Sequence, residues 1–121
     1  MTTAGTVAPV DLRLSIDVVD RLPVLTLSGT VDLATLPELQ GGLLRLLADH
    51  HGRRVAVDLD GVDALDDTAL GVLLGAAGRA RQAGGDVAIV CANERLRTRL
   101  AVTGLDRAVS VTGGIAELLT S

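Results

Sequence analysis

Alternating apolar and polar positions near the amino terminus predict a pair of strands. From Leu12 to Val18 every second residue is apolar and the residues between are polar, which is the period of a half-buried strand. Residues 20–23 form a turn signal, and a second apolar run, Val24–Leu27, follows it. We therefore expect a hairpin, preceded by a flexible tail over residues 1–10.

Four later segments carry apolar residues at spacings of three and four, the period of an amphipathic helix. Thr35 and Glu38 have the spacing of a capping box at the start of the first helix. Asp66 or Asp67 opens the second helix, and Asn93 caps the third. These predicted helices run over about 36–49, 66–82, 94–103 and 115–119.

Short apolar runs between the helices predict buried strands at Val55–Leu59 and Asp86–Cys91, and a short edge strand at Val109–Val111. The segment Asp60–Asp66 is rich in acids and is expected to be a loop. Strands that alternate with helices indicate an α/β fold with right-handed crossovers. The predicted sheet is mixed but mostly parallel, with five strands and about four helices mainly on one face.

The composition narrows the possible functions. The chain has a net charge of −4 and contains no Phe, Tyr or Trp, so it lacks both the basic footprint and the stacking platform of a nucleic-acid binder. The 48% of apolar residues must then build a core of Leu, Val, Ile and Ala. All 11 basic residues are Arg, and the absence of Lys excludes Schiff-base and P-loop lysine chemistry.

The single cysteine, Cys91, cannot form an internal disulfide, which favours a reducing compartment. The first residues lack the basic and apolar regions of a signal peptide. The longest apolar stretches are too short to span a bilayer. We expect a cytoplasmic protein without direct membrane insertion.

Acidic residues gather where the central strand is predicted to end, which is where ligands and partners meet an open α/β sheet. The segment Asp66-Asp67-Thr68 opens a helix, whose amino terminus favours negative charge by about 0.3–1 kcal/mol. A phosphate on a hydroxyl would be equally favoured there. The simpler alternative is that Asp66 or Asp67 is an N-cap with Thr68 in the first turn.

Three other features have simple structural explanations. His50-His51 follows a helix carboxyl terminus and has no Cys or carboxylate at ligand spacing nearby. A redox role for Cys91 would require exposure and a depressed pKa. The alternating Arg95, Arg97 and Arg99 form a solvated face, although Arg95 sits at the same strand-end rim as Asp67. Gly71, Gly75 and Gly78 share one helical face, which favours close approach to the sheet over a helix-mediated dimer.

No catalytic constellation is recognisable. A phosphorelay receiver would use Asp58 but needs an acidic pair after its first strand and a lysine near its last. Gly29 stands alone where a dinucleotide-binding fold needs a glycine-rich turn. The Gly-x-Ser-x-Gly of a nucleophile elbow is absent. We expect no enzyme, no cofactor and no metal.

Four segments resemble one family in the same order along the chain. They are Ser28–Thr35, Val57–Val62, Thr103–Asp106 and Asp66-Asp67-Thr68-Ala69-Leu70-Gly71-Val72-Leu73-Leu74, which falls on the signature Asp-Ser-Ser/Thr-Gly-Leu-Gly. From about Leu12 to Leu119 the chain is similar to the anti-anti-sigma factor, or anti-sigma factor antagonist, branch of the STAS domain family. The resemblance implies one STAS domain over residues 11–121.

That resemblance also implies a mechanism. In such a family a dephosphorylated antagonist captures an anti-sigma factor, often a Ser/Thr kinase, and frees the sigma factor. Phosphorylation of the signature Ser adds a charge of about −1.5 to −2 and breaks the capture. Here Asp67 occupies the acceptor position and Ala69 the following glycine position.

Three hypotheses follow for Asp67: its fixed charge imitates the phosphorylated state, or it is too weak to block docking, or Thr68 has become the acceptor. We favour a lost or altered switch over the third. The predicted partner-binding surface comprises Asp32, Asp66, Asp67, Thr68, Asn93 and Arg95 of a monomer or weak homodimer. The alternative function within the resemblance is a STAS regulatory subunit of a transporter or a stress-signalling complex.

Overall fold

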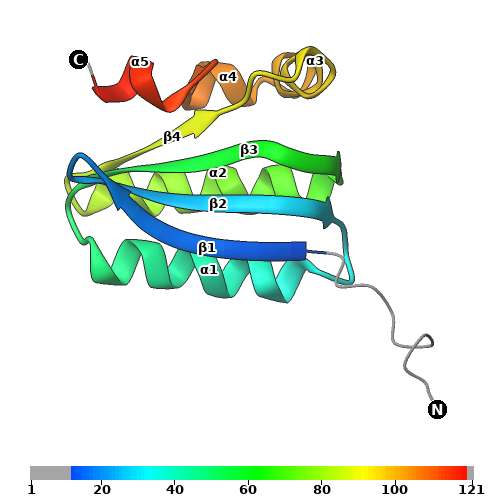
Figure 1. The fold of residues 1–121 in the computed structure, drawn as a ribbon. Coiled ribbons are helices and arrows are strands. Elements are labelled where there is room, and N and C mark those ends of the chain that lie inside the picture. Colours follow the sequence, from blue (N-terminus) through cyan, green and yellow to red (C-terminus); the bar gives the residue numbers. More distant parts are fainter. Residues whose placement is uncertain (1–11, 120–121) are drawn as a thin grey trace.

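The computed structural model describes residues 12–119, and the expected tail over residues 1–10 lies outside them. The five strands are β1 (Leu12–Val19), β2 (Leu22–Val31), β3 (Arg54–Leu65), β4 (Asp86–Val90) and β5 (Ser110–Thr112). The five helices are α1 (Leu36–Asp49), α2 (Asp67–Gln82), α3 (Glu94–Thr103), α4 (Leu105–Ala108) and α5 (Ile115–Leu119). The order of strands and helices along the chain follows the predicted alternation (Figure 1).

The strands form one sheet in the order β1-β2-β3-β4-β5. The β1–β2 pair is antiparallel and the other three pairs are parallel. Asp20 and Arg21, which join the hairpin, have positive φ angles of 47° and 72°. Positive φ at both central residues is the geometry of a type I′ turn, whose twist matches the flanking strands. The predicted mixed, mostly parallel five-strand sheet is confirmed.

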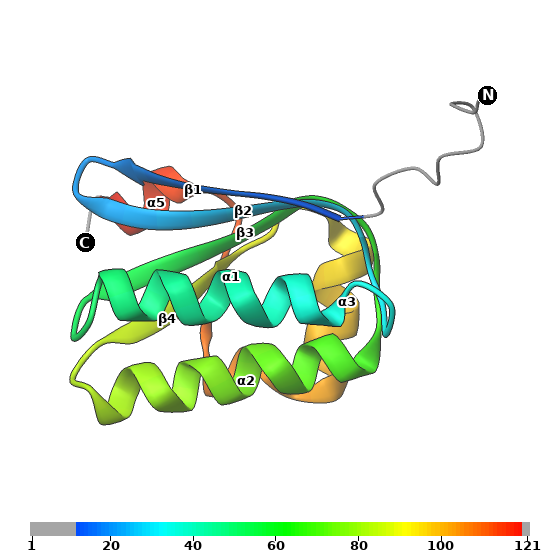
Figure 2. The same cartoon turned by 90° about the horizontal axis from the view of Figure 1, so that it is seen from below.

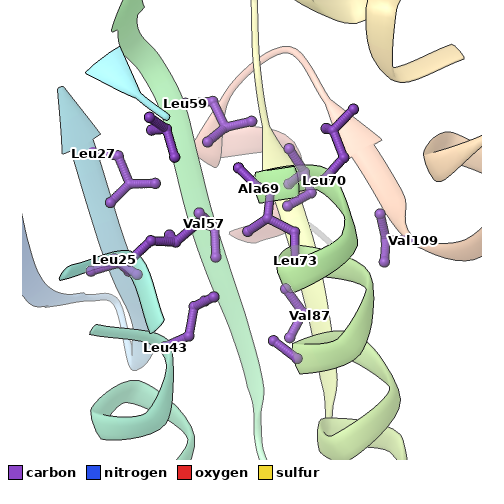
Figure 3. Close-up of a cluster of buried hydrophobic side chains, with 14 of the residues drawn as sticks. Leu25, Leu27, Leu43, Val57, Leu59, Ala69, Leu70, Leu73, Val87 and Val109 are labelled. Carbon is purple, nitrogen blue, oxygen red and sulfur yellow. The ribbon is translucent and has the colours of Figure 1, made fainter. Parts of the chain in front are cut away.

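Helices α1 and α2 lie side by side across one face of the sheet, and α5 lies against the other (Figure 2). The larger core is built between the sheet and the α1–α2 layer, with contributions from α3 and α4 (Figure 3). A smaller cluster on the opposite face joins Leu118 of α5 to Leu22 and Val24. Both clusters are aliphatic, as the absence of aromatic residues requires.

Strand β3 is longer than predicted, and the expected acidic loop over Asp60–Asp66 is wrong for all but its last residue. Strand β2 also continues to Val31, and the two strands pair along this extension with one register shift before the Ser28–Gly61 pair and another after the Gly29–Val62 pair. At each shift β3 contains one extra residue, so its buried positions Leu59, Val62 and Leu65 come every third residue. This bulged spacing hides the strand period of two from sequence analysis.

Gly61 is needed at the first bulge. A Cβ atom there would lie 2.8 Å from the Cβ of Ser28 and 3.0 Å from the carbonyl oxygen of Leu27. Real Cβ atoms do not approach other atoms so closely, so a larger residue would push β2 and β3 apart. The close contact between the two strands therefore explains the glycine at position 61, which the sequence had placed in a predicted loop.

Three smaller expectations are also corrected. The Thr35–Glu38 capping box does not form, because the Thr35 hydroxyl donates to the carbonyl of Thr30 instead. A Cβ at Gly71, Gly75 or Gly78 would meet no atom within 4 Å, so that helical face does not provide close approach to the sheet. Gly104, with φ of 82°, ends α3 and starts α4, which gives five helices in place of four.

Candidate partner-binding rim

The start of α2 is anchored to the carboxyl ends of β2 and β3. The backbone N–H of Asp66 donates to the carbonyl of Val31 over 2.8 Å, and the Asp66 carboxylate accepts from the N–H of Thr68 over 3.1 Å. Asp66 has the extended backbone of an N-cap, and α2 begins at Asp67. The two alternatives for this N-cap are thereby resolved in favour of Asp66, and Asp67 is the first helical residue.

Asp67 points away from the core, with 79% of its side chain exposed. Its carboxylate accepts a hydrogen bond from the guanidinium of Arg99 at an N–O distance of 2.6 Å, which makes an ion pair between α2 and α3. Asp67 also sits in the first turn of α2, where the helix dipole favours negative charge. Two cationic influences therefore converge on one carboxylate.

The start of α3 uses the same kind of cap. The Asn93 side-chain oxygen accepts from the N–H groups of Arg95 at 2.9 Å and Leu96 at 3.2 Å. The preceding N–H, of Ala92, donates to the carboxylate of Asp60 over 2.6 Å. The Arg95 guanidinium donates to the carbonyl of Asp63 over 3.3 Å, which ties α3 to the bulged half of β3.

Asp32 begins the connection between β2 and α1. Its carboxylate accepts from the N–H of Thr35 over 3.0 Å, and its own N–H donates to the Thr35 hydroxyl over 3.0 Å. This reciprocal pair makes Asp32 a turn residue. It belongs to the same edge of the sheet as Asp66, because the N–H of Asp66 bonds the residue that precedes Asp32.

The structure thus brings five of the six predicted surface residues to two neighbouring helix starts and leaves Asp32 on the adjoining turn. We call this edge the rim: Asp32, Asp66, Asp67, Thr68, Asn93, Arg95 and, in addition, Arg99. Arg99 was the residue that sequence analysis missed, because it was assigned to a solvated face. Its position four residues after Arg95, on the same side of a helix, was the available signal.

A shallow groove of about 440 Å³ adjoins the rim. Another groove, of about 470 Å³, lies away from the rim, between the carboxyl-terminal ends of α1 and α2. The rim groove runs between α2 and the α3–α4 junction. Asp67 stands at one end of it, and Leu70, Leu74 and Leu105 supply apolar surface. Val102, on the last turn of α3, is 81% exposed and Leu74 is 44% exposed. Exposed apolar side chains therefore lie on the same two helices as the polar residues of the rim.

Cys91 lies just beyond β4 and is fully buried. Burial raises the pKa of its thiol, and the thiol lies 3.6 Å from the carbonyl oxygen of Asn93. Neither the exposure nor the depressed pKa that a reactive cysteine requires is present.

Within residues 12–119, no three His, Cys, Asp or Glu side chains gather where a metal ion would be held. His50 and His51 instead line the groove between the ends of α1 and α2. Over the same part of the chain, none of the helices combines the length and apolar character needed to cross a membrane.

Solved structures of several bacterial proteins share this fold. An anti-sigma factor antagonist from Mycobacterium paratuberculosis superposes with a TM-score of 0.83 at 24% identity, covering 93% of this chain and 95% of that one. An anti-sigma-factor antagonist (STAS) domain protein from Planctomyces limnophilus gives 0.75 at 16% identity, covering 88% and 95%. The phosphorylated form of the Bacillus cell fate determinant SpoIIAA gives 0.65 at 12% identity, covering 88% and 96%.

A comparison with curated proteins finds no significant match. The family model described as the STAS domain, in contrast, matches residues 13–117, which is nearly all of the part that the structure describes. The matched region contains all of the sheet except the first residue of β1, together with every residue of the rim. The chain therefore belongs to the STAS domain family.

Proposed function

We propose that this protein is an anti-sigma factor antagonist that binds a kinase-type anti-sigma factor through the rim. The observation that carries the proposal is the placement of the signature segment. Asp66 caps α2, and Asp67, in the phospho-acceptor position of that segment, is the exposed first residue of the helix. A partner approaching the carboxyl ends of β3 and β4 would meet this position first, and the protein would act in the cytoplasm by binding and not by catalysis.

The polar groups of the rim already have partners within the chain. Asp32 bonds Thr35, Asp66 and Asn93 cap helices, and Arg95 bonds a β3 carbonyl. Groups that are already satisfied contribute shape and specificity more than new hydrogen bonds. Affinity would then come mainly from apolar surface such as Leu74 in the groove and the exposed Val102 on α3, because burial of apolar area drives association.

A phosphorylation switch at Thr68 is disfavoured by its surroundings. The Thr68 hydroxyl lies 3.4 Å from the carboxylate of Asp66, to which it donates. A phosphate on this oxygen would add a charge of about −1.5 to −2 beside the carboxylates of two adjacent aspartates. This supports the hypothesis that the switch is lost or altered over the hypothesis that it has moved to Thr68.

Calorimetric titration of the purified protein with each candidate anti-sigma kinase of its genome tests the proposal. Wild type, Asp67→Ser and the matched control Glu94→Ser, at the equivalent position of α3, are compared with and without ATP. We expect wild type and Glu94→Ser to bind one kinase with micromolar or better affinity, unaffected by ATP. ATP should weaken the Asp67→Ser complex alone.

Phosphate found on Thr68 by mass spectrometry of natively expressed protein would contradict the lost-switch hypothesis. Binding of no candidate by any variant would contradict the antagonist proposal itself. Copurification with a membrane ATPase would then favour the transporter-subunit alternative, and sedimentation of the same samples would report monomer or homodimer.

A further inference from the structure

We propose that Arg99 cancels the charge of Asp67 at the rim, so that the protein presents its partner with the electrostatics of an unphosphorylated antagonist. This inference rests on the proposed function and concerns its regulation. It makes Arg99 a specificity-determining residue, and it selects among the three hypotheses for Asp67 the one in which the protein binds permanently.

The geometry supports a specific ion pair between Asp67 and Arg99. The guanidinium and carboxylate approach to 2.6 Å, a charge-assisted hydrogen bond. Arg99 is the less exposed partner, with 39% of its side chain exposed against 79% for Asp67. Both residues belong to helices whose starts are capped by Asx side chains, so the helices hold the two groups at a set separation.

Three other charged groups near the pair have hydrogen-bond partners of their own. The guanidinium of Arg95, one turn earlier on α3, donates a hydrogen bond to the carbonyl of Asp63. The carboxylate of Asp66 accepts a hydrogen bond from the N–H of Thr68, and the carboxylate of Asp60 accepts one from the N–H of Ala92. Arg95, Asp66 and Asp60 therefore each have another partner, and Asp67 with Arg99 forms the ion pair that joins α2 to α3.

The arithmetic of charge explains the expected effect. An aspartate carries one negative charge and an arginine one positive charge, so the pair sums to zero. A phosphate at this position would carry about −1.5 to −2 and would leave an excess of negative charge even beside Arg99. Asp67 with Arg99 therefore lacks the repulsion by which a phosphorylated antagonist is rejected, and removal of Arg99 alone should restore part of it.

The first readout needs no partner. In the wild-type protein, NMR of the Arg99 guanidinium should show slowed rotation and restricted exchange, and Asp67→Asn should abolish both. Arg97→Ala, a loss of the same charge from the same helix, should leave the Arg99 signals unchanged. Freely rotating Arg99 in wild type would overturn the inference whatever the partner does.

The second readout is a double-mutant cycle of binding to the anti-sigma factor identified above. Arg99→Ala should weaken binding about tenfold, because an unpaired negative charge then faces the partner. Asp67→Asn/Arg99→Ala should return to within about twofold of wild type, since neither charge remains. Arg97→Ala should bind as wild type, Arg99→Lys should retain most of the affinity, and high salt should shrink the loss caused by Arg99→Ala.

The outcomes separate the two proposals. Equal affinity of Arg99→Ala and wild type would overturn the inference while leaving the antagonist function in place. A double variant as weak as Arg99→Ala would also overturn it, by showing that Arg99 contacts the partner directly. Failure of every variant to bind any candidate, with the NMR signature of the pair intact, would overturn the proposed function and the binding role of Arg99 with it.

Discussion

The starts of α2 and α3 are built by the same local rules. Each has an Asx N-cap, Asp66 or Asn93, whose side chain accepts from backbone N–H groups of the first turn. Each has an acid as the first helical residue, Asp67 or Glu94, where the dipole favours it. The third helical residue of each, Ala69 or Leu96, is buried against the larger core.

The difference between them lies outside the local sequence. Asp67 pairs with an arginine that follows it by 32 residues, across to the next helix. Glu94 contributes to its own helix start as an acid in the first turn. Capping and dipole terms therefore explain why an acid is acceptable at both positions, whereas only the cross-helix contact distinguishes the position that carries the proposed function.

The largest expected effect concerns the buried residues of the two helix starts. Leu96→Ala should lower the free energy of unfolding by about 2–5 kcal/mol, because it leaves a cavity in the core. Ala69→Gly at the matching position of α2 should cost only about 0.5–1 kcal/mol, since it removes one methyl group and adds backbone freedom. Urea unfolding of both variants measures the two losses, and equal losses would contradict the comparison.

Removal of the caps should have the next largest effect. Asp66→Ala and Asn93→Ala should each cost about 0.5–2 kcal/mol of stability. The Asn93 variant should lose at least as much, because its side chain accepts two N–H groups and that of Asp66 accepts one. Chemical denaturation reports both, with Asn93→Asp as a control that keeps the cap, and a clearly smaller loss at Asn93 would refute the ranking.

The first-turn acids should differ in a smaller and salt-dependent way. Glu94→Gln should cost about 0.3–1 kcal/mol through the helix dipole. Asp67→Asn should cost up to about 1 kcal/mol more, because it also breaks an exposed ion pair. Thermal unfolding at low salt and in about 1 M NaCl should show the difference shrink as the pair is screened. A difference that survives high salt would mean that the two acids differ by something other than this pair.

The smallest effect at neutral pH is expected from Cys91, which lies buried just before the α3 cap. Because burial raises its folded-state pKa, the folded protein holds the thiol proton more tightly than the unfolded chain does. Stability is then unaffected below the unfolded pKa of about 8.5 and falls as the pH rises above it. Urea unfolding at neutral and alkaline pH should show this fall in wild type and a shallower one in Cys91→Ala. Parallel profiles would argue against the buried thiol.

Much of the fold could be predicted from the sequence, because segments with the two-residue period of a strand and segments with the period of a helix do not overlap along the chain. The alternation from Leu12 to Val18 and the helical spacings each predicted the correct element, and Asn93 was identified as a cap. Local signals of this kind depend only on neighbours along the chain, which is why they could be read without a structure.

The errors came where a residue's role depends on a distant partner. Thr35 had the capping-box spacing, but the carbonyl of Thr30 and the carboxylate of Asp32 use its side chain and N–H. The predicted surface residues were grouped from the strand ends, and the spacing of Arg95 and Arg99 indicated one side of α3, but the acidic partner of Arg99 became visible only when α2 and α3 were placed together. No period along one helix could indicate which acid across the gap an arginine would meet.

The bulged half of β3 implies that deletions of one residue and of three residues should differ in their effect on the core. Apolar and acidic residues recur there as the pairs Leu59-Asp60, Val62-Asp63 and Leu65-Asp66, one pair every three residues. Deletion of a single residue inside this stretch would move the following side chains to the opposite face of the sheet, which would place an aspartate in the core. Deletion of one whole triplet, which spans two residues of β2 because of its bulge, would keep every later residue on its own face and draw the start of α2 back by about 7 Å, at about 3.3 Å per β2 residue. Deletions of three residues in this stretch should therefore disturb the core less than deletions of one.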